Sequence, residues 1–150
     1  MNTDEIETYL KKDPACKDMF YGVYSSDNIP TISKLPALIV CNTDTRRGPG
    51  EHWIVIYLDN TGHGEYFDSF GRRPEDGFKT FLDEHCSSWI CNERQLQSVI
   101  SSFCGHYCIF FSLYRSRGVD LRSIVKLFTK DTGLNDSIVH KFVCKMKTNK

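Results

Sequence analysis

The stretch that most constrains the fold of this chain is Phe103-Cys104-Gly105-His106-Tyr107-Cys108-Ile109-Phe110-Phe111. Apolar residues recur in it at helical spacing, and they surround the expected helix on most sides. Arg115-Ser116-Arg117-Gly118 then ends the helix. A helix that is apolar on most sides must be buried, so we predict that it is the central helix of the domain. Its first turn carries a cysteine, Cys104.

Length and charge exclude several classes of protein. The chain has 150 residues, 40% of them hydrophobic, which suits one domain (1–150) that buries roughly 70% of its unfolded surface. Nineteen basic and nineteen acidic residues give a formal net charge of zero, so the whole chain gives no indication of binding nucleic acid or anionic membranes. No apolar run approaches the ~20 residues needed to span a bilayer, and the acidic N-terminus does not match a secretory signal. We expect a monomer that is neither secreted nor membrane-bound.

The seven cysteines are an odd number and lack the dense, even spacing of a secreted disulfide scaffold. We therefore expect a reducing compartment with at least one free thiol. Zinc is the rival interpretation, because four cysteines and two histidines lie close in sequence: Cys86, Cys91, Cys104, Cys108, His85 and His106. Their spacing contains no paired C-x-x-C pattern, and two of the cysteines fall in the apolar helix. We predict no metal site, and Cys108 is expected in the core.

Periodicity and turn residues predict the remaining elements. They are a helix at 4–12 capped by Thr3 and ended by Pro14, an aromatic turn at 20–24, a buried strand at 37–41, a helix at 78–84, a strand or extended connection at 88–98, and helices at 121–128 and 136–147. With the hairpin described next, this order predicts an α+β fold in which a small, mostly antiparallel sheet is flanked by helices.

The hairpin is the clearest strand signal in the chain. The segment 52–58 is rich in β-branched and aromatic residues, 59–62 supplies a turn, and 64–68 returns. Because the two strands are antiparallel, the outer ends lie side by side. Those ends carry His52 and Asp68, so we expect an imidazole and a carboxylate within hydrogen-bonding distance.

These residues combine into a site for acyl transfer. A thiol attacks a carbonyl as the thiolate, and both a helix N-terminus and an adjacent imidazolium lower its pKa; Cys104 is offered both. Gly105 lets another backbone or a substrate approach, and the Cys104 amide is available to a developing oxyanion. Gln97 lies seven residues upstream and has a side-chain amide for the second donor. The set is base, orienting acid, oxyanion donor and nucleophile: His52, Asp68, Gln97 and Cys104.

The order of these motifs resembles the adenovirus protease (adenain) family and, more distantly, the Ulp/SENP cysteine proteases of the same clan. The residues that carry the resemblance are Phe20-Tyr21-Gly22-Val23-Tyr24, Asn42-Thr43, Gly50-Glu51-His52-Trp53, Tyr66-Phe67-Asp68-Ser69-Phe70-Gly71, Gln97 and Cys104-Gly105-x-x-Cys108, spread over roughly residues 5 to 115. The resemblance implies a cysteine endopeptidase with Cys104 as nucleophile, His52 as base, Asp68 as acid and Gln97 as oxyanion donor. Adenain has glutamate at the acid position, whereas the Ulp branch has aspartate. The Gln97 spacing resembles adenain, and Gln95 is the fallback donor.

Substrate and activator expectations also come from the resemblance. It implies cleavage at glycine-containing sites in viral or virus-like capsid and core precursors, within virions and the host cell interior. Trp53 is expected to wall the channel to the nucleophile. Members of the adenain family are activated by a small peptide, which can be disulfide-linked, and by DNA; Cys86 has a spacing similar to the peptide-linked cysteine, although a free or buried thiol is the simpler interpretation. Four loop arginines could form a basic patch near the site, and solvated loop charges explain them equally well: Arg46, Arg47, Arg72 and Arg73.

Two other functions stay open at this level. The first is a Ulp-like isopeptidase that acts on SUMO, ubiquitin or a related modifier. The second is a catalytically silent binding module that keeps the fold. No cofactor is required by the sequence. His106 is next to the nucleophile in sequence but about a third of a helical turn away, so we expect it to be a packed or surface residue rather than a catalytic one.

Overall fold

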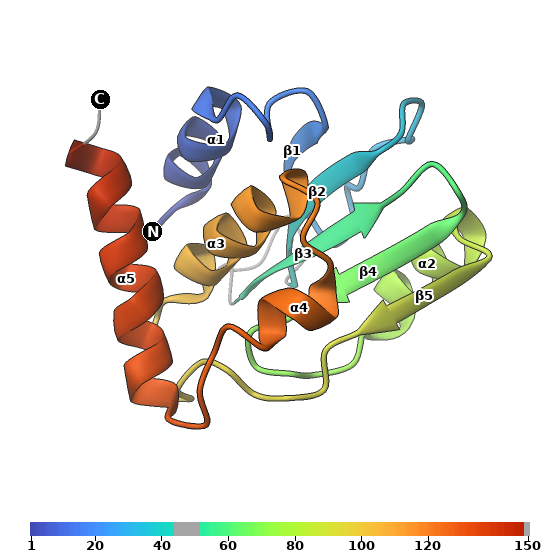
Figure 1. Ribbon diagram of the computed structural model, residues 1–150. Helices are drawn as coiled ribbons and strands as arrows, with labels where there is room; N and C mark the ends of the chain where they lie inside the picture. The colour runs from blue at the N-terminus through green and yellow to red at the C-terminus, as the bar shows by residue number, and fades with distance from the viewer. Residues whose placement is uncertain (44–51, 149–150) are drawn as a thin grey trace.

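A computed structural model of the protein describes residues 1–43 and 52–148, which form one five-stranded sheet with helices on both faces (Figure 1). The elements in chain order are α1 (Thr3–Lys12), β1 (Phe20–Ser25), β2 (Ala37–Asn42), β3 (Trp53–Leu58), β4 (His63–Phe67), α2 (Asp76–His85), β5 (Ser88–Cys91), α3 (Cys104–Ser116), α4 (Leu121–Val125) and α5 (Thr132–Thr148).

The strands follow the sequence order β1-β2-β3-β4-β5 across the sheet. The three central strands pair antiparallel, and the β3–β4 hairpin aligns Leu58 with Gly64 and Val55 with Phe67. The two edge strands join in the parallel sense, β1 beside β2 and β5 beside β4. The predicted α+β fold is confirmed, and the expected antiparallel pairing is that of the three central strands.

Helices cover both faces of the sheet, so its central strands are buried on both sides. In β2, Leu38 and Val40 face the core under α3, whereas Ala37, Ile39 and Cys41 face the core under α2. This alternation explains why β2 reads as an unbroken apolar run instead of a half-polar one. Figure 1 shows α2 on one side of the sheet and the remaining helices on the other.

The helix predicted as central is central. Nine of the thirteen residues of α3 are buried, and the ring of Phe111 stacks on Phe67 of β4 with centroids 4.6 Å apart. The ring of Phe110 points the other way and contacts Phe128 and Phe142. Contacts on opposite sides leave α3 with little exposed surface, which is the reason that its sequence is apolar almost all round.

Three sequence predictions differ from the structure in detail. Residues 20–25 form strand β1 rather than a turn, because their main chain pairs with β2. The N-cap of α1 is Asn2, not Thr3: the Asn2 side chain accepts a hydrogen bond from the Glu5 N–H at 2.9 Å, and Glu5 returns one to the Asn2 N–H. The strand expected within 88–98 is short and ends at Cys91.

No helix in residues 1–43 and 52–148 is both long and apolar enough to cross a membrane.

Candidate active site

The open end of the β3–β4 hairpin holds a buried imidazole–carboxylate pair. His52 directly precedes β3 and Asp68 directly follows β4. The His52 Nε2–H donates to Asp68 Oδ1 over 2.7 Å, and the two residues are 5% and 2% exposed. The carbonyl of His52 also accepts from the Thr43 N–H at 2.7 Å, which extends the β2–β3 pairing by one step. The structure thus brings together the two residues that the hairpin argument expected to meet.

Phe70 holds both members of this pair. Its ring stacks on the His52 imidazole, with centroids 4.6 Å apart and planes 26° apart, and its backbone N–H donates to Asp68 Oδ1 at 2.8 Å. The Arg72 guanidinium lies over the Phe70 ring, 5.0 Å from its centroid. The imidazole is therefore fixed by one hydrogen bond and one ring face.

Cys104 begins α3, and its thiol interacts with His52. Because Nε2 is bonded to Asp68, the ring nitrogen left for the thiol is Nδ1, which is buried and makes no hydrogen bond of good geometry within residues 1–43 and 52–148. Burial alone would lower the pKa of His52, but hydrogen bonding and negative charge from Asp68 and Cys104 outweigh it and raise that pKa to about 9. A protonated imidazole beside the thiol is the result.

The pKa of the Cys104 thiol is lowered, whereas that of His52 is raised. Burial alone would raise the pKa of Cys104, but hydrogen bonding to His52 and to the Trp53 amide, the imidazolium charge and the Gly105 amide together lower it. The pair thus favours a thiolate and an imidazolium, which is the state in which a cysteine is nucleophilic. Helix geometry adds to this, because the first N–H groups of α3 have no partner within the helix.

The two candidate oxyanion donors occupy different environments. Gln97 is fully buried: its Oε1 accepts from Ser69 Oγ at 2.6 Å, and its Nε2 donates to the Ser101 carbonyl and hydroxyl at 3.1 Å each. Gln95 is exposed, and its amide donates to the Gln97 carbonyl at 2.9 Å. A side-chain amide carries two N–H groups, and both find acceptors on Ser101, so donation to an oxyanion would replace one of these bonds. The role of Gln97 as the donor, with Gln95 as the fallback, stays a prediction.

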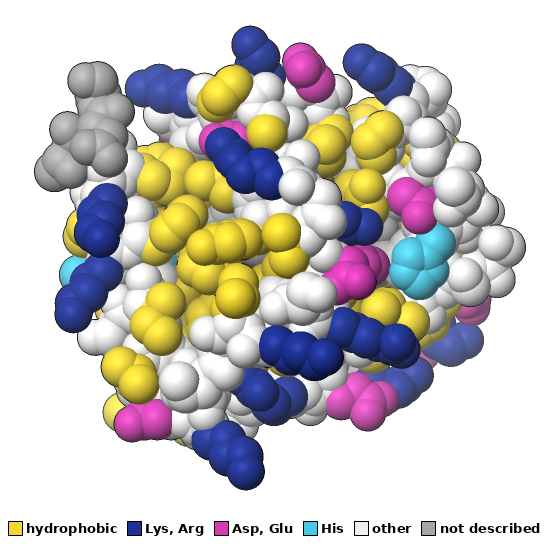
Figure 2. All heavy atoms as spheres, in the orientation of Figure 1, with side chains coloured by type: hydrophobic (Ala, Val, Ile, Leu, Met, Phe, Trp, Pro, Cys, Tyr) yellow, Lys and Arg dark blue, Asp and Glu magenta, His cyan; other side chains and the backbone are white. Residues whose placement is uncertain are grey.

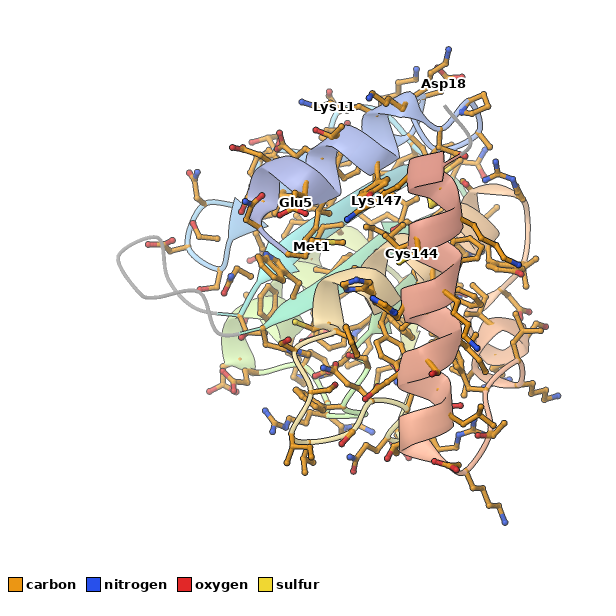
Figure 3. The ribbon with its side chains drawn as sticks, turned by 90° about the vertical axis from the view of Figure 1, so that its left-hand side faces the viewer. Met1, Glu5, Lys11, Asp18, Cys144 and Lys147 are labelled. Atoms are coloured by element: carbon orange, nitrogen blue, oxygen red, sulfur yellow. The ribbon has the colours of Figure 1, made fainter. Side chains whose placement is uncertain are left out.

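Gly105 is buried against the N-terminal segment of its own chain. A Cβ at this position would lie 3.1 Å from Met1 Sδ and 3.3 Å from Ile6 Cδ1, and Figure 3 shows Met1 beside the start of α3. The side of this glycine where a Cβ would stand is therefore closed by Met1 and Ile6, and the substrate contact expected of Gly105 stays a prediction. Any contact of Gly105 with substrate would involve its main chain.

The other predicted site residues have distinct surroundings. Trp53 is half-buried at the start of β3, and its indole N–H is buried without a partner in the described part of the chain; its place in a substrate channel stays a prediction. Cys86 packs on the hairpin, since a Cβ on Gly64 would lie 2.5 Å from its sulfur. Burial, followed by the charges of Asp59 and Asp83, raises the pKa of the Cys86 thiol.

His106 is a packed residue, not a partner of the nucleophile. Its ring meets Phe103 edge-on at 4.9 Å and lies 5.8 Å from the ring of His140. Burial, then the charge of His140, lowers the pKa of His106 to about 4. In the ranges that the structure describes, no three His, Cys, Asp or Glu side chains gather as a metal site would require.

Sequence reasoning missed two residues that support the pair. Phe70 lies within a quoted motif but was given no role, and Asn92 was not singled out. Asn92 is 6% exposed and bonds the main chain of Asp68. The sequence signal for this turn was the glycine at position 71. In the structure Gly71 has φ +73°, and a Cβ on it would lie 2.7 Å from the Arg94 carbonyl carbon. The Asp68 turn is therefore pressed against the segment after β5.

Comparison with known sequences finds a viral enzyme. The chain is homologous to cysteine protease S273R of African swine fever virus (isolate Tick/Malawi/Lil 20-1/1983), with 25% identity over 115 residues. The match covers 69% of this chain and 40% of the relative, so the chain spans less than half of that protein's length. No protein-family model matches the chain.

Comparison with solved structures agrees on the fold. The African swine fever virus pS273R protease superimposes with a TM-score of 0.65 at 18% identity, over 91% of this chain and 64% of the other. ChlaDub1 from Chlamydia trachomatis superimposes with a TM-score of 0.54 at 18% identity, over 67% of this chain and 48% of the other. The central domain of Lpg1148 from Legionella pneumophila superimposes with a TM-score of 0.56 at 14% identity, over 97% of this chain and 94% of the other. A specific likeness to adenain stays a prediction. What the comparisons establish is that the chain has the fold of the Ulp/SENP-like cysteine proteases and is homologous to a viral cysteine protease.

Proposed function

We propose that this protein is a thiol endopeptidase with Cys104 as its nucleophile. The observation that carries the proposal is the buried His52–Asp68 hydrogen bond of 2.7 Å, whose imidazole interacts on its other side with a cysteine at a helix start. Homology to a cysteine protease supports the same reaction. Among the functions left open by the sequence, a silent binding module gives no reason for a buried His52–Asp68 pair beside the thiol of Cys104.

The proposed reaction assigns one task to each residue. The Cys104 thiolate attacks the scissile carbonyl, and the carbonyl electron pair moves to oxygen, where the Cys104 N–H and the Gln97 amide bind it. The His52 imidazolium gives its proton to the leaving amine as the C–N bond breaks. Water then attacks the thioester and gives its proton to His52, and the acid product and free thiolate are released. Asp68 keeps His52 oriented through both steps.

The proposed substrates are proteins and peptides cut at glycine-containing sites, in particular capsid or core precursors of a virus or virus-like element. The relative detected in sequence is viral, which supports this choice. The protein would act as a monomer in virions and in the host cell interior. An isopeptidase acting on SUMO, ubiquitin or a related modifier is the second candidate, because the Ulp/SENP-like fold supports both activities.

The activators implied by the adenain resemblance have weaker support. Arg46 and Arg47 lie outside the described residues, Arg73 pairs with Glu93, and Arg72 stacks on Phe70. Figure 2 shows Lys and Arg side chains mixed with Asp and Glu over one face of the molecule. Strong binding to DNA relies on a surplus of basic residues. Peptide activation through Cys86 has only the spacing in its favour.

One experiment separates these possibilities. Cys104→Ala and His52→Ala should each abolish cleavage of a Gly-Gly-type peptide while circular dichroism stays that of the wild type; a fully active Cys104→Ala would refute the proposal. An endopeptidase should cut the peptide and ignore a ubiquitin-like vinyl sulfone, whereas an isopeptidase should form an adduct with the probe at Cys104. Addition of duplex DNA to the peptide assay tests the activator directly.

A further inference from the structure

Asn92 is bonded to both main-chain polar groups of Asp68. Its Nδ2 donates to the Asp68 carbonyl at 2.6 Å, and its Oδ1 accepts from the Asp68 N–H at 3.0 Å. A longer contact of 3.5 Å joins Nδ2 to the Arg94 carbonyl. The side chain is buried, and 24 residues separate it from Asp68 in the sequence. Both partners on Asp68 are main-chain atoms, so the contact depends on backbone position.

The location explains why a side chain is used here. The parallel ladder between β4 and β5 has its last aligned pair at Tyr66 and Cys91, and β4 ends one residue before Asp68. Buried main-chain N–H and C=O groups must find partners beyond that point. The Asn92 carboxamide has the donor and acceptor of a peptide group, so it continues the pairing where the strands stop.

The main chain held in this way carries the acid of the site. Asp68 Oδ1 accepts from His52 Nε2 at 2.7 Å and from the Phe70 N–H at 2.8 Å. The Asp68 carbonyl also accepts from the Gly71 N–H at 2.8 Å, which closes a turn. Asn92 thus links Asp68 itself to the end of β5, whereas the next residue, Ser69, is held through its carbonyl by the Leu96 and Gln97 N–H groups at 2.9 and 3.0 Å. Loss of the Asn92 bonds would therefore loosen the main chain at Asp68 relative to His52.

We propose that Asn92 is a positioning residue, which fixes the Asp68 main chain and through it the carboxylate that orients His52 toward Cys104. The inference rests on the proposed thiol protease function. A displacement of about 1 Å in a catalytic group can reduce a rate by about a hundredfold. The negative charge of Asp68 also acts on three further titratable groups, whose pKa values it raises: Tyr66, Cys91 and Cys108. The Arg72 guanidinium also lies over the Phe70 ring, which stacks on His52.

The chain contains a matched control for this test. Asn135 is fully buried and bonds both main-chain polar groups of Thr129: its Nδ2 donates to the Thr129 carbonyl at 2.9 Å, and its Oδ1 accepts from the Thr129 N–H at 2.8 Å. Its Nδ2 also donates to the Leu96 carbonyl at 3.1 Å. Replacing it removes the same kind of clamp from a segment that does not touch the His52–Asp68 pair.

The experiment compares Asn92→Leu, which keeps the branched shape of the side chain and removes both bonds, with Asn135→Leu. Two readouts are taken: kcat and KM on the Gly-Gly-type peptide, and the rate of Cys104 alkylation by iodoacetamide across pH. Thermal unfolding monitors stability. We expect Asn92→Leu to lower kcat between about tenfold and a hundredfold with little change in KM, and to move the midpoint of alkylation to higher pH. Asn135→Leu should lose comparable stability and leave the alkylation midpoint unchanged, because its bonds are to Thr129 and to the Leu96 carbonyl beside Gln97 and not to the His52–Asp68 pair.

A second variant keeps the test decisive if Asn92→Leu does not fold. Asn92→Asp keeps the size of the side chain and the oxygen that accepts from the Asp68 N–H, but its carboxylate cannot donate to the Asp68 carbonyl, so kcat should again fall. The inference is overturned if a folded Asn92 variant matches the wild type in kcat and alkylation profile. A wild-type Cys104 that is not alkylated selectively at mildly acidic pH would instead overturn the proposed function, so the two failures are distinguishable.

Discussion

The imidazole of His52 and the ring of Phe70 are stacked, with centroids 4.6 Å apart and an interplanar angle of 26°. The same Phe70 donates its backbone N–H to Asp68, the hydrogen-bond partner of His52. One residue therefore supports the base by its ring and the acid by its main chain. Only the first contribution depends on the side chain, so the two can be separated by mutation.

Replacement of Phe70 by alanine should remove the ring contact and leave the backbone hydrogen bond in place. The imidazole then gains freedom to rotate, and we expect kcat on the peptide substrate to fall by roughly tenfold, as for a modest misplacement of a catalytic group. The matched control is Phe81→Ala, because Phe81 stacks on His85 at 4.0 Å on helix α2. The role of the Phe70 ring is refuted if both variants keep wild-type kcat.

Alanine substitution of Gln97 and of Gln95 should have different effects on kcat if Gln97 is the oxyanion donor. Gln97 is buried beside Ser69 and Ser101, whereas Gln95 is exposed and bonds the Gln97 carbonyl. Removal of one oxyanion donor typically lowers kcat by about 10²–10³-fold, so we expect a loss of that order in Gln97→Ala and only a small change in Gln95→Ala. Steady-state kinetics on the peptide decide this, and the reverse ranking would assign the donor to Gln95.

The pH profile of peptide cleavage should have two limbs set by the same pair. Cleavage needs the Cys104 thiolate, so activity should rise at an acidic pH below the usual thiol range, because the pKa of Cys104 is lowered. Cleavage also needs the His52 imidazolium as acid, and its pKa is raised to about 9. Activity should therefore persist through neutrality and fall as the pH passes about 9. An alkaline limb that ends near pH 6.5 would mean that His52 is unperturbed.

The buried ion pair between Glu65 of β4 and Arg115 of α3 should contribute to stability. Arg115 Nε lies 2.8 Å from Glu65 Oε1, and its guanidinium also lies 4.0 Å from the centre of the Tyr57 ring. Glu65 is 1% exposed, and its other oxygen accepts from the Leu121 N–H at 3.2 Å. Arg115→Ala leaves a buried carboxylate without its cation, which costs about 3–5 kcal/mol of unfolding free energy.

Chemical denaturation of Arg115→Ala measures that loss. The control is Arg73→Ala, because Arg73 pairs with Glu93 on the surface, where both side chains are about two-thirds exposed; exposed pairs contribute about 0–1 kcal/mol. Equal and small losses in the two variants would show that the buried Glu65 is neutralised without Arg115.

The sequence predicted the chemistry of the candidate site through local patterns. An apolar helix that begins with Cys104 must be buried, and its N-terminus must then lie at the edge of the core. A short turn within 59–62 aligns the hairpin and brings His52 to Asp68, because antiparallel pairing fixes which residues lie opposite each other. Both inferences needed only contacts within one or two neighbouring elements.

Local patterns could not supply contacts between distant segments. The aromatic run 20–24 was predicted as a turn, since its strand character depends on pairing with β2. The difference between Gln97 and Gln95 is one of burial, and the partner of the buried side chain is Ser69, 28 residues earlier. The alternation of apolar and polar residues could not have shown which glutamine is buried, because the segment after β5 has no regular secondary structure.

The sequence by itself thus determined the α+β fold class and the candidate residues His52, Asp68 and Cys104, because secondary-structure periodicity and hairpin geometry act over short distances along the chain. Only the tertiary structure decided what holds them: the ring of Phe70 on His52 and the carboxamide of Asn92 on the Asp68 main chain. An asparagine after a strand looks like an ordinary loop residue until its partner, 24 positions away, is known. That partner is set by sheet order and strand ends, which no local pattern specifies.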